Sequence, residues 1–270
     1  MASIDTEALI LRSVDFGESD RILHLLVPEM GRLTAIAKGA RRSVKRFPGT
    51  LDLFNHLRIQ AVQRRTAGMA RLEHARLIRT FHALRTDPTR FALGCYLLEL
   101  LDRLAPEGGA RADTKRIFGF ALAALGTLDD ERPDLRLRTL LEIRGLDAVG
   151  LRPELRCCVR CTEPVGTGSR RSRVGVHIAD GGPVCEGCAG TGQDLMPIHL
   201  GTLRALERSL ELSPDRLARL ALGGVALAEA RHLVGRFLHF HVGINLRSAP
   251  FLDEMLPGGT IASPGVFSTD

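Results

Sequence analysis

Two Cys-x-x-Cys pairs constrain the fold of this chain more than any other feature. Cys158 pairs with Cys161, Cys185 pairs with Cys188, and 23 residues lie between the two pairs. Each pair can direct two thiolates at one centre, and four thiolates complete the closed tetrahedral site of structural zinc. The segment between them is rich in Gly, Ser and Arg and is too polar to hold itself together without a metal. We therefore predict a Zn²⁺ ion bound by Cys158, Cys161, Cys185 and Cys188.

Two further side chains are weighed as ligands of this predicted zinc. Cys157 adjoins the first pair and His177 lies between the pairs, but the four paired cysteines already fill a tetrahedral site. Such a site keeps no open position for water or substrate, so its zinc is expected to be structural. A redox function is disfavoured, because redox Cys-x-x-Cys motifs generally occur as a single pair near a βαβ unit.

Positive charge is concentrated in the N-terminal part. The 270-residue chain carries a formal net charge of +6, with a sequence pI of about 9.4. Residues 31–65 hold nine basic residues and one acid, Asp52. Such a concentrated field is typical of nucleic-acid binders, and the alternative is a merely solvated basic face. The predicted nucleic-acid-binding residues are Arg32, Lys38, Arg41, Arg42, Lys45, Arg46, Arg58, Arg64 and Arg65.

Residues 1–80 show the pattern of a small β-barrel. Large or branched apolar residues mix with polar ones in five short segments, and turn signals separate them: 6–14, 21–27, 32–38, 51–62 and 69–78. We favour an OB barrel, which presents a loop-framed face to oligonucleotides, although an SH3-like barrel would give nearly the same pattern. The loop from Gly39 to Thr50 would place basic side chains at the rim. Phe47 and Phe54 are candidates for base stacking, with a core position favoured for both.

From Asp87 onward the hydrophobic period is helical. Asp87 precedes Pro88 as an N-cap, three amphipathic helices follow to about residue 149, and the pattern returns at 200–212 and 214–242 with a possible break at Gly223. The chain is therefore predicted to be an α+β multidomain protein. Its parts are an OB-fold domain at 1–80, a helical domain at 81–155 and 193–248, a four-cysteine zinc insertion at 156–192 and a flexible tail at 249–270.

Motifs of several enzyme classes are missing from the sequence. It contains no GxxxxGK[ST] loop, HExxH, GxSxG or deaminase HxE with PCxxC. Asp15, Glu18 and Asp20 could suggest a metal-dependent nuclease, but solvated acids in a turn are the favoured interpretation. No signal peptide and no apolar run of membrane-spanning length is found. We therefore expect a cytoplasmic binding protein, with no membrane association and no enzymatic turnover.

The order of these features resembles the bacterial recombination mediator family RecO. Residues 8–12 and 17–21 (ALILR and GESDR) are similar to the opening strand and turn of that family. The most telling match runs from GRL at 31–33 to AKGARR at 37–42, which includes Lys38, Arg41 and Arg42. The likeness continues through LEIR at 141–144, GLRPEL at 150–155, and HVG and LRS at 241–248. It covers about residues 4–255 in the same order.

The resemblance implies a function without enzymatic turnover. Proteins of this family bind single- and double-stranded DNA, anneal complementary strands and, with RecR, help to load RecA on strands coated by single-strand-binding protein. The acidic C-terminal tail of single-strand-binding protein is then an expected ligand for a groove between helices, and association with the nucleoid is expected. The alternative is an RNA-binding or ribosome-associated protein, for which an OB barrel with a four-cysteine knuckle would also be suitable.

Overall fold

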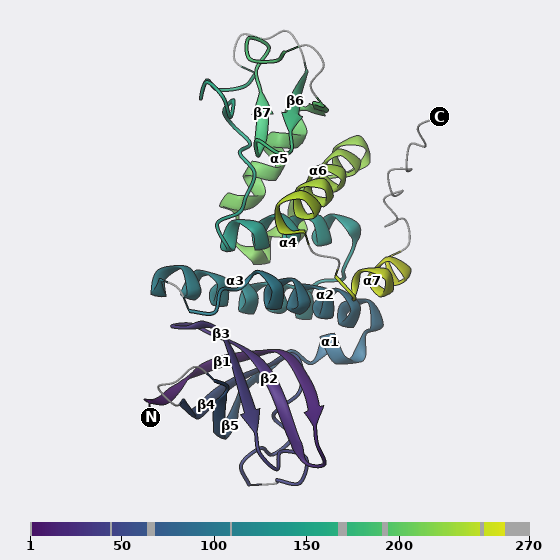
Figure 1. The fold of residues 1–270 in the computed structure, drawn as a ribbon. Helices are drawn as coiled ribbons and strands as arrows, with labels where there is room; N and C mark the ends of the chain where they lie inside the picture. The colour runs from purple at the N-terminus through teal and green to yellow at the C-terminus, as the bar shows by residue number, and fades with distance from the viewer. Residues whose placement is uncertain are drawn as a thin grey trace, which may run out of the picture.

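The computed structural model describes residues 2–43, 45–63, 68–108, 110–166, 172–190, 194–243 and 246–256. A β-barrel forms one end of the molecule, a layer of helices covers it, further helices lie on that layer, and a small sheet lies at the opposite end (Figure 1). Within the described ranges, none of the helices is both long and apolar enough to cross a membrane.

The N-terminal barrel is closed by five strands. They are β1 (Ala2–Phe16), β2 (Asp20–Val27), β3 (Gly31–Ala37), β4 (Asn55–Gln63) and β5 (Ala70–Thr80). Their order is β1-β2-β3-β5-β4, and the β3–β5 contact is parallel while the other pairs are antiparallel. This is the OB arrangement, so the predicted OB barrel is confirmed over the SH3-like alternative.

Alternating side chains fill the barrel. Leu33, Ala35 and Ala37 of β3 are buried, while the residues between them are partly exposed. Phe47 and Phe54 are also buried, which confirms the favoured core position for both. The fourth strand starts later than predicted because Phe54 has a φ of 64°, a left-handed conformation that interrupts an extended strand.

The helical part contains α1 (Ala83–Thr86), α2 (Pro88–Leu104), α3 (Arg111–Asp130) and α4 (Leu135–Ala148), and later α5 (Leu200–Glu211), the 3₁₀ helix η1 (Pro214–Arg219), α6 (Gly224–Val242) and α7 (Ala249–Met255). The carboxylate of Asp87 accepts hydrogen bonds from the N–H groups of Thr89 and Arg90, each at 2.9 Å. The predicted N-cap is therefore confirmed. The break at Gly223 is confirmed as well, because α6 begins at the next residue.

A three-stranded sheet lies beside the cysteine pairs. Its strands are β6 (Arg173–His177), β7 (Gly182–Val184) and β8 (Met196–His199), in the order β7-β6-β8. Cys185 directly follows β7, and the N–H of Val159 donates to the carbonyl of Pro183 at 3.0 Å. These strands were not predicted from the sequence, because they are only three to five residues long. β8 leads directly into α5, so the sheet is joined rigidly to the helices.

The interior of the barrel forms a hydrophobic cluster of its own, and the outer face of the barrel shares a second, larger cluster with the helices. Leu9, Leu26 and Phe54 of the barrel belong to the same buried cluster as Leu97 of α2 and Phe118 of α3. A boundary at residue 80 therefore separates elements that pack against each other.

Backbone contacts extend this junction. The N–H of Arg32 donates to the carbonyl of Pro106 at 2.8 Å, and the N–H of Gly108 donates to the carbonyl of Met30 at 2.9 Å. Between them, Gly31 has a φ of 71°, and a Cβ atom at this position would lie 2.3 Å from the Pro106 oxygen. Only glycine fits so close an approach.

The predicted flexible tail begins too early, and this part of the prediction is wrong. Residues 249–255 form α7, and Leu252 is fully buried in the helical core. The carboxylate of Glu99 accepts hydrogen bonds from the N–H groups of Arg247 and Ser248 and from the Ser248 hydroxyl, at 2.6 to 2.9 Å. The buried side chains of Leu252 and Leu256, together with this carboxylate, therefore fix the segment against the helices. Residues 257–270 lie outside the described residues.

Candidate nucleic-acid interface and metal centre

The loop between β3 and β4 lies against the β1–β2 turn at one end of the barrel. The N–H of Arg41 donates to the carbonyl of Ser19 at 3.0 Å, and the N–H of Gly39 donates to the Asp20 carboxylate at 2.8 Å. The Lys38 ammonium contacts the other oxygen of Asp20 at 2.6 Å. Residues about twenty positions apart in sequence therefore form one surface, which we call the basic loop: the turn 17–20 and the described residues 38–43 and 45–50.

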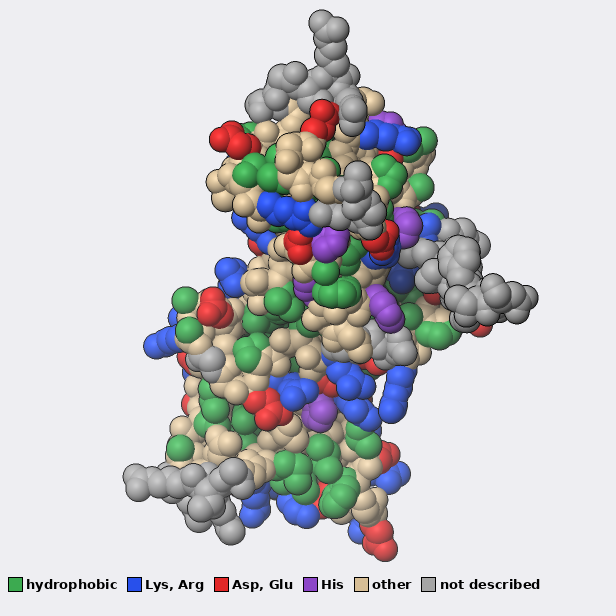
Figure 2. Space-filling view, turned by 45° about the horizontal axis from the view of Figure 1, so that its top comes forward, with side chains coloured by type: hydrophobic (Ala, Val, Ile, Leu, Met, Phe, Trp, Pro, Cys, Tyr) green, Lys and Arg blue, Asp and Glu red, His purple; other side chains and the backbone are tan. Residues whose placement is uncertain are grey.

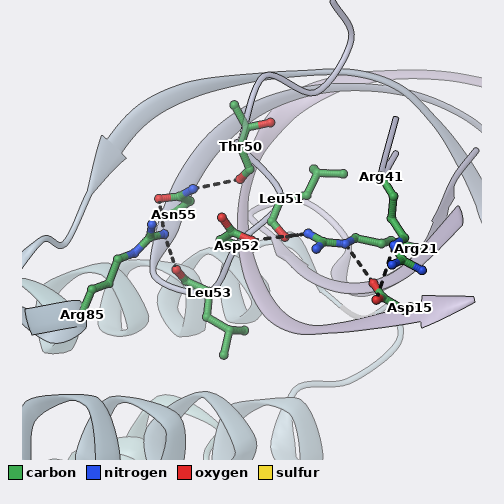
Figure 3. A network of polar contacts seen from close by, with 9 residues as sticks. All are labelled: Asp15, Arg21, Arg41, Thr50, Leu51, Asp52, Leu53, Asn55 and Arg85. Atoms are coloured by element: carbon green, nitrogen blue, oxygen red, sulfur yellow. Dashed lines mark hydrogen bonds and ion pairs between the residues drawn. The ribbon is translucent and has the colours of Figure 1, made fainter. Parts of the chain in front are cut away.

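Carboxylates neutralise part of this positive surface. Arg21 contacts Asp15 at 3.1 Å and Asp52 at 3.3 Å, and it donates to the carbonyl of Leu51 at 3.2 Å (Figure 3). Arg41 lies 3.7 Å from the same Asp15. The net field is therefore weaker than the charge count of residues 31–65 suggests, because Asp15 and Asp20 come from outside that stretch.

The basic side chains of the loop differ in availability. Lys38 and Arg41 are paired with acids but remain about half exposed, at 51% and 47%. Arg46 donates to the carbonyl of Lys38, and its guanidinium lies 5.2 Å from the centre of the Phe47 ring. Arg42 and Lys45 are exposed, and among the described residues no hydrogen-bond or ion-pair partner is found for the side chain of either. Arg42 and Lys45 are thus the cations most available to an external phosphate.

Other predicted residues lie elsewhere. Arg32 is the second residue of β3, whereas Lys38 follows the far end of that strand. The Arg32 guanidinium contacts Glu107 and the carbonyl of Asp102, each at 2.7 Å. It joins the barrel to α2 and is not brought to the basic loop. Arg58 on β4 is paired with Asp5 at 2.6 Å. Arg64 and Arg65 lie outside the described residues.

Arg21 and Phe16 at this end of the barrel were not among the residues predicted from the sequence. Phe16 ends β1 with 49% of its surface exposed. Arg12, Val14 and Phe16 are spaced two apart, and the charge of Arg12 is a signal that this side of the strand faces outward, but a bulge between Ile10 and Arg12 shifts the register. Because a bulge reverses which residues face outward, the pattern upstream predicts the wrong face.

The four paired cysteines form a compact cluster. Their Sγ atoms all lie within 4.8 Å of one another, and those of Cys161 and Cys185 are 3.6 Å apart. Thiolates bound to one zinc at about 2.3 Å lie roughly 3.8 Å apart, so the cluster fits such an ion. Cys157 and His177 are not part of the cluster. Within the described ranges, the four cysteines named from sequence form the cluster that could hold a metal.

Backbone turns position these thiols. The N–H of Thr162 donates to the carbonyl of Cys158 at 2.8 Å, the N–H of Cys188 donates to that of Cys185 at 3.0 Å, and the N–H of Cys185 lies 3.4 Å from the Cys158 sulfur. Burial acts to raise the pKa of Cys158, but hydrogen bonds from backbone N–H groups lower it to about 6. Hydrogen bonding with Cys185 and Cys161 raises the pKa of Cys188 to about 12. Without a cation, therefore, the four sulfurs do not all carry charge at neutral pH.

A cavity of about 500 Å³ opens between α2, α4, α6 and α7. Its apolar wall includes Leu100, Leu238 and Val242. Its polar wall includes Arg138, which lies over the Tyr96 ring at 4.9 Å and donates to the carboxylates of Glu142 and Asp253; the Tyr96 hydroxyl donates to Glu142 at 2.7 Å. The cavity thus combines an apolar surface with the guanidinium of Arg138. One partner of this guanidinium, Asp253, lies on α7, near the C-terminal end of the described chain.

Comparison with known proteins assigns both halves of the chain. Residues 1–81 match the family model described as recombination protein O N terminal, and residues 85–250 match recombination protein O C terminal. The chain is 36% identical to a DNA repair protein RecO of Anaeromyxobacter dehalogenans over 257 residues, covering 95% of this chain and 98% of the relative. It is 32% identical to that of Myxococcus xanthus, covering 94% and 99%, and 30% identical to that of Syntrophus aciditrophicus, covering 94% and 96%.

Proposed function

The chain belongs to the recombination protein O family of DNA repair proteins, and from that premise we propose that it is a recombination mediator whose barrel binds DNA. It binds single and double strands, anneals complementary strands and, with RecR, promotes the loading of RecA on strands coated by single-strand-binding protein. The observation that carries the proposal is the basic loop, where Arg42 and Lys45 project from an OB barrel without a polar partner in the described residues.

This arrangement suits sequence-independent binding. Cations on a loop contact phosphates, which are the same in every sequence, and they gain affinity by releasing counterions from the nucleic acid. Binding two strands at such a surface reduces their mutual repulsion, which favours annealing. No nucleotide hydrolysis is needed for these steps, so the protein acts without enzymatic turnover.

The cysteine cluster holds a structural Zn²⁺ ion in this proposal. Four thiolates fill its coordination sphere and leave no site for substrate. The ion joins the turn at Cys158 to the turn at Cys185, and the adjoining sheet continues through β8 into α5. The metal therefore supports the helical half and takes no part in DNA chemistry.

The tail of single-strand-binding protein occupies the cavity between α2, α4, α6 and α7. An acidic tail with an apolar anchor is complementary to Arg138 beside the apolar wall of Leu238 and Val242. Asp253 already contacts Arg138, so the incoming carboxylate would replace it. Leu238→Glu should weaken binding of a synthetic tail peptide to the full chain, whereas Val225→Glu, at an exposed position of the same helix, should not.

The protein is cytoplasmic and associates with the nucleoid in this proposal, since its ligands are there. The test is to mix the full-length protein with labelled single-stranded DNA, duplex DNA and RNA of one length, and to follow the pairing of complementary DNA strands. We expect binding to both forms of DNA and faster annealing without any nucleotide. Failure to anneal, together with tighter binding to RNA, would support the RNA-binding alternative instead.

A further inference from the structure

The outer face of β1 carries exposed apolar residues beside the basic loop. Val14 is 42% exposed and Phe16 is 49% exposed. In a strand, residues two apart point to the same side, so both side chains lie on one face, about 7 Å apart. Phe16 pairs across the ladder with Asp20, which Lys38 contacts at 2.6 Å. The exposed ring therefore lies next to the basic loop.

The neighbouring strands extend this apolar surface. Val14 pairs with Ile22 of β2, and Ile22 pairs with Ile36 of β3. Both isoleucines are half-buried. We call Val14, Phe16, Ile22 and Ile36 the apolar strip. Figure 2 shows hydrophobic side chains gathered on the visible face of the barrel, with Lys and Arg side chains beside them.

The strip is not part of the contact between the barrel and the helices. Ile22, His24 and Leu26 lie on the same face of β2. His24 contacts the buried Asp102 of α2 at 2.7 Å, and Leu26 is buried in the core that the barrel shares with the helices. The helices therefore pack over this face as far as His24 and leave Val14 and Phe16 exposed. Apolar side chains grouped on a surface usually mark an interaction site, and the cations beside them favour a polyanion as the occupant.

We propose that the apolar strip receives the unpaired bases of single-stranded DNA, with the Phe16 ring stacking on one base while the basic loop holds the adjoining phosphates. The proposal rests on the DNA-binding function proposed above. It assigns Phe16 as the residue through which the protein binds single strands in preference to duplex DNA. A duplex buries the faces of its bases, so the ring can contribute only to a strand whose bases are free. Phosphate contacts serve both forms alike.

The test compares Phe16→Ala with the wild-type full chain on two ligands of equal length and charge, an oligothymidine strand and an abasic strand. We expect the substitution to weaken oligothymidine binding about 5- to 100-fold. It should leave binding to the abasic strand and the slope of log affinity against log salt unchanged, because no phosphate contact is lost. Phe240→Ala, which removes a ring on α6 that is exposed to 58%, should change neither affinity.

Two further variants separate the effect of an aromatic ring from the effect of apolar volume at position 16. Phe16→Leu keeps the apolar volume without an aromatic face and should behave like Phe16→Ala, while Phe16→Trp should restore binding. Oligothymidine affinity that is equal in wild type and Phe16→Leu would overturn the proposal, and so would an equal loss on both ligands. A wild-type chain that bound neither strand would instead remove the DNA-binding function itself, so the two failures are distinguishable.

Discussion

Lys38 holds Asp20 at 2.6 Å, so a lysine of the basic loop also fastens residues 38–50 to the β1–β2 turn. The Lys38 hydrogen bond, aided by the Gly39 N–H, keeps the pKa of the Asp20 carboxyl below its usual range. This one contact therefore serves both electrostatics and local structure. Substitutions in the loop need to be chosen so that these two effects are separated.

Arg42 and Lys45 provide that separation. Because neither has a polar partner among the described residues, Arg42→Ala with Lys45→Ala should leave the melting temperature unchanged. Each lost phosphate contact should reduce the slope of log affinity against log salt by about 0.7 on single strands and 0.9 on duplex. The matched control is Lys115→Ala with Arg204→Ala, exposed positions of the helical half that remove the same charge. An unaltered slope in the loop variant would contradict the assignment.

Removal of the metal ligands should destabilise the helical half. Cys158→Ser with Cys161→Ser is expected to lower the bound metal from about one ion per chain to none. It should cost at least about 3 kcal/mol of stability, since metal binding contributes directly to folding. Elemental analysis and thermal unfolding measure the two effects. Cys157→Ser, outside the cluster, should retain the ion, and a double variant that kept its metal would rule out these ligands.

Glu99 should make the attachment of α7 dependent on pH. Burial acts to raise the pKa of Glu99, but hydrogen bonds from the Ser248 hydroxyl and from the N–H groups of Arg247 and Ser248 outweigh it and lower the pKa. Glu99→Gln should therefore cost about 1–2 kcal/mol at pH 7.

The sign of this effect can be checked by denaturation at several pH values. Because the native pKa lies below the unfolded value of about 4.3, the stabilisation is fully present above that value and is lost as the pH falls through the native pKa. The difference between wild type and Glu99→Gln should shrink in that acidic range. A difference that grew on acidification would contradict the role given to the carboxylate.

Gly31 should be among the least replaceable residues of the barrel. An alanine there must adopt a left-handed backbone and displace the Pro106 carbonyl, at a cost of about 3 kcal/mol or more. Gly17 is the matched control, with a φ of 59° and no atom within 4 Å of the position that a Cβ atom would occupy. Gly17→Ala should cost only about 1–2 kcal/mol for the backbone conformation. Denaturant unfolding that gave both variants equal stability would show that the contact with Pro106 is unimportant.

The sequence predicted the features that depend on local patterns. The strand segment at 32–38, the Asp87 cap and the spacing of the four cysteines each follow from a few neighbouring residues, and all are observed. Features that depend on distant segments were missed. Whether Asp15 neutralises Arg41 depends on how the loop between β3 and β4 packs against the end of β1. The attachment of α7 depends on Glu99, which lies about 150 positions earlier in the sequence. The exposure of Phe16 depends on the bulge after Ile10 and on where the cover by α2 stops.

Gly31 approaches Pro106 closely, and Leu26 of the barrel shares a core with Phe118 of α3. These contacts limit how the barrel can be exchanged by engineering and how its sequence can change in evolution. The barrel is not an interchangeable module. Transplanting another OB domain onto these helices would require a matching apolar outer face and a glycine at the contacting turn, so chimeras with borrowed barrels should be poorly folded unless the surfaces of α2 and α3 are exchanged with them. Sequence change on the two sides of this junction is then expected to be coupled.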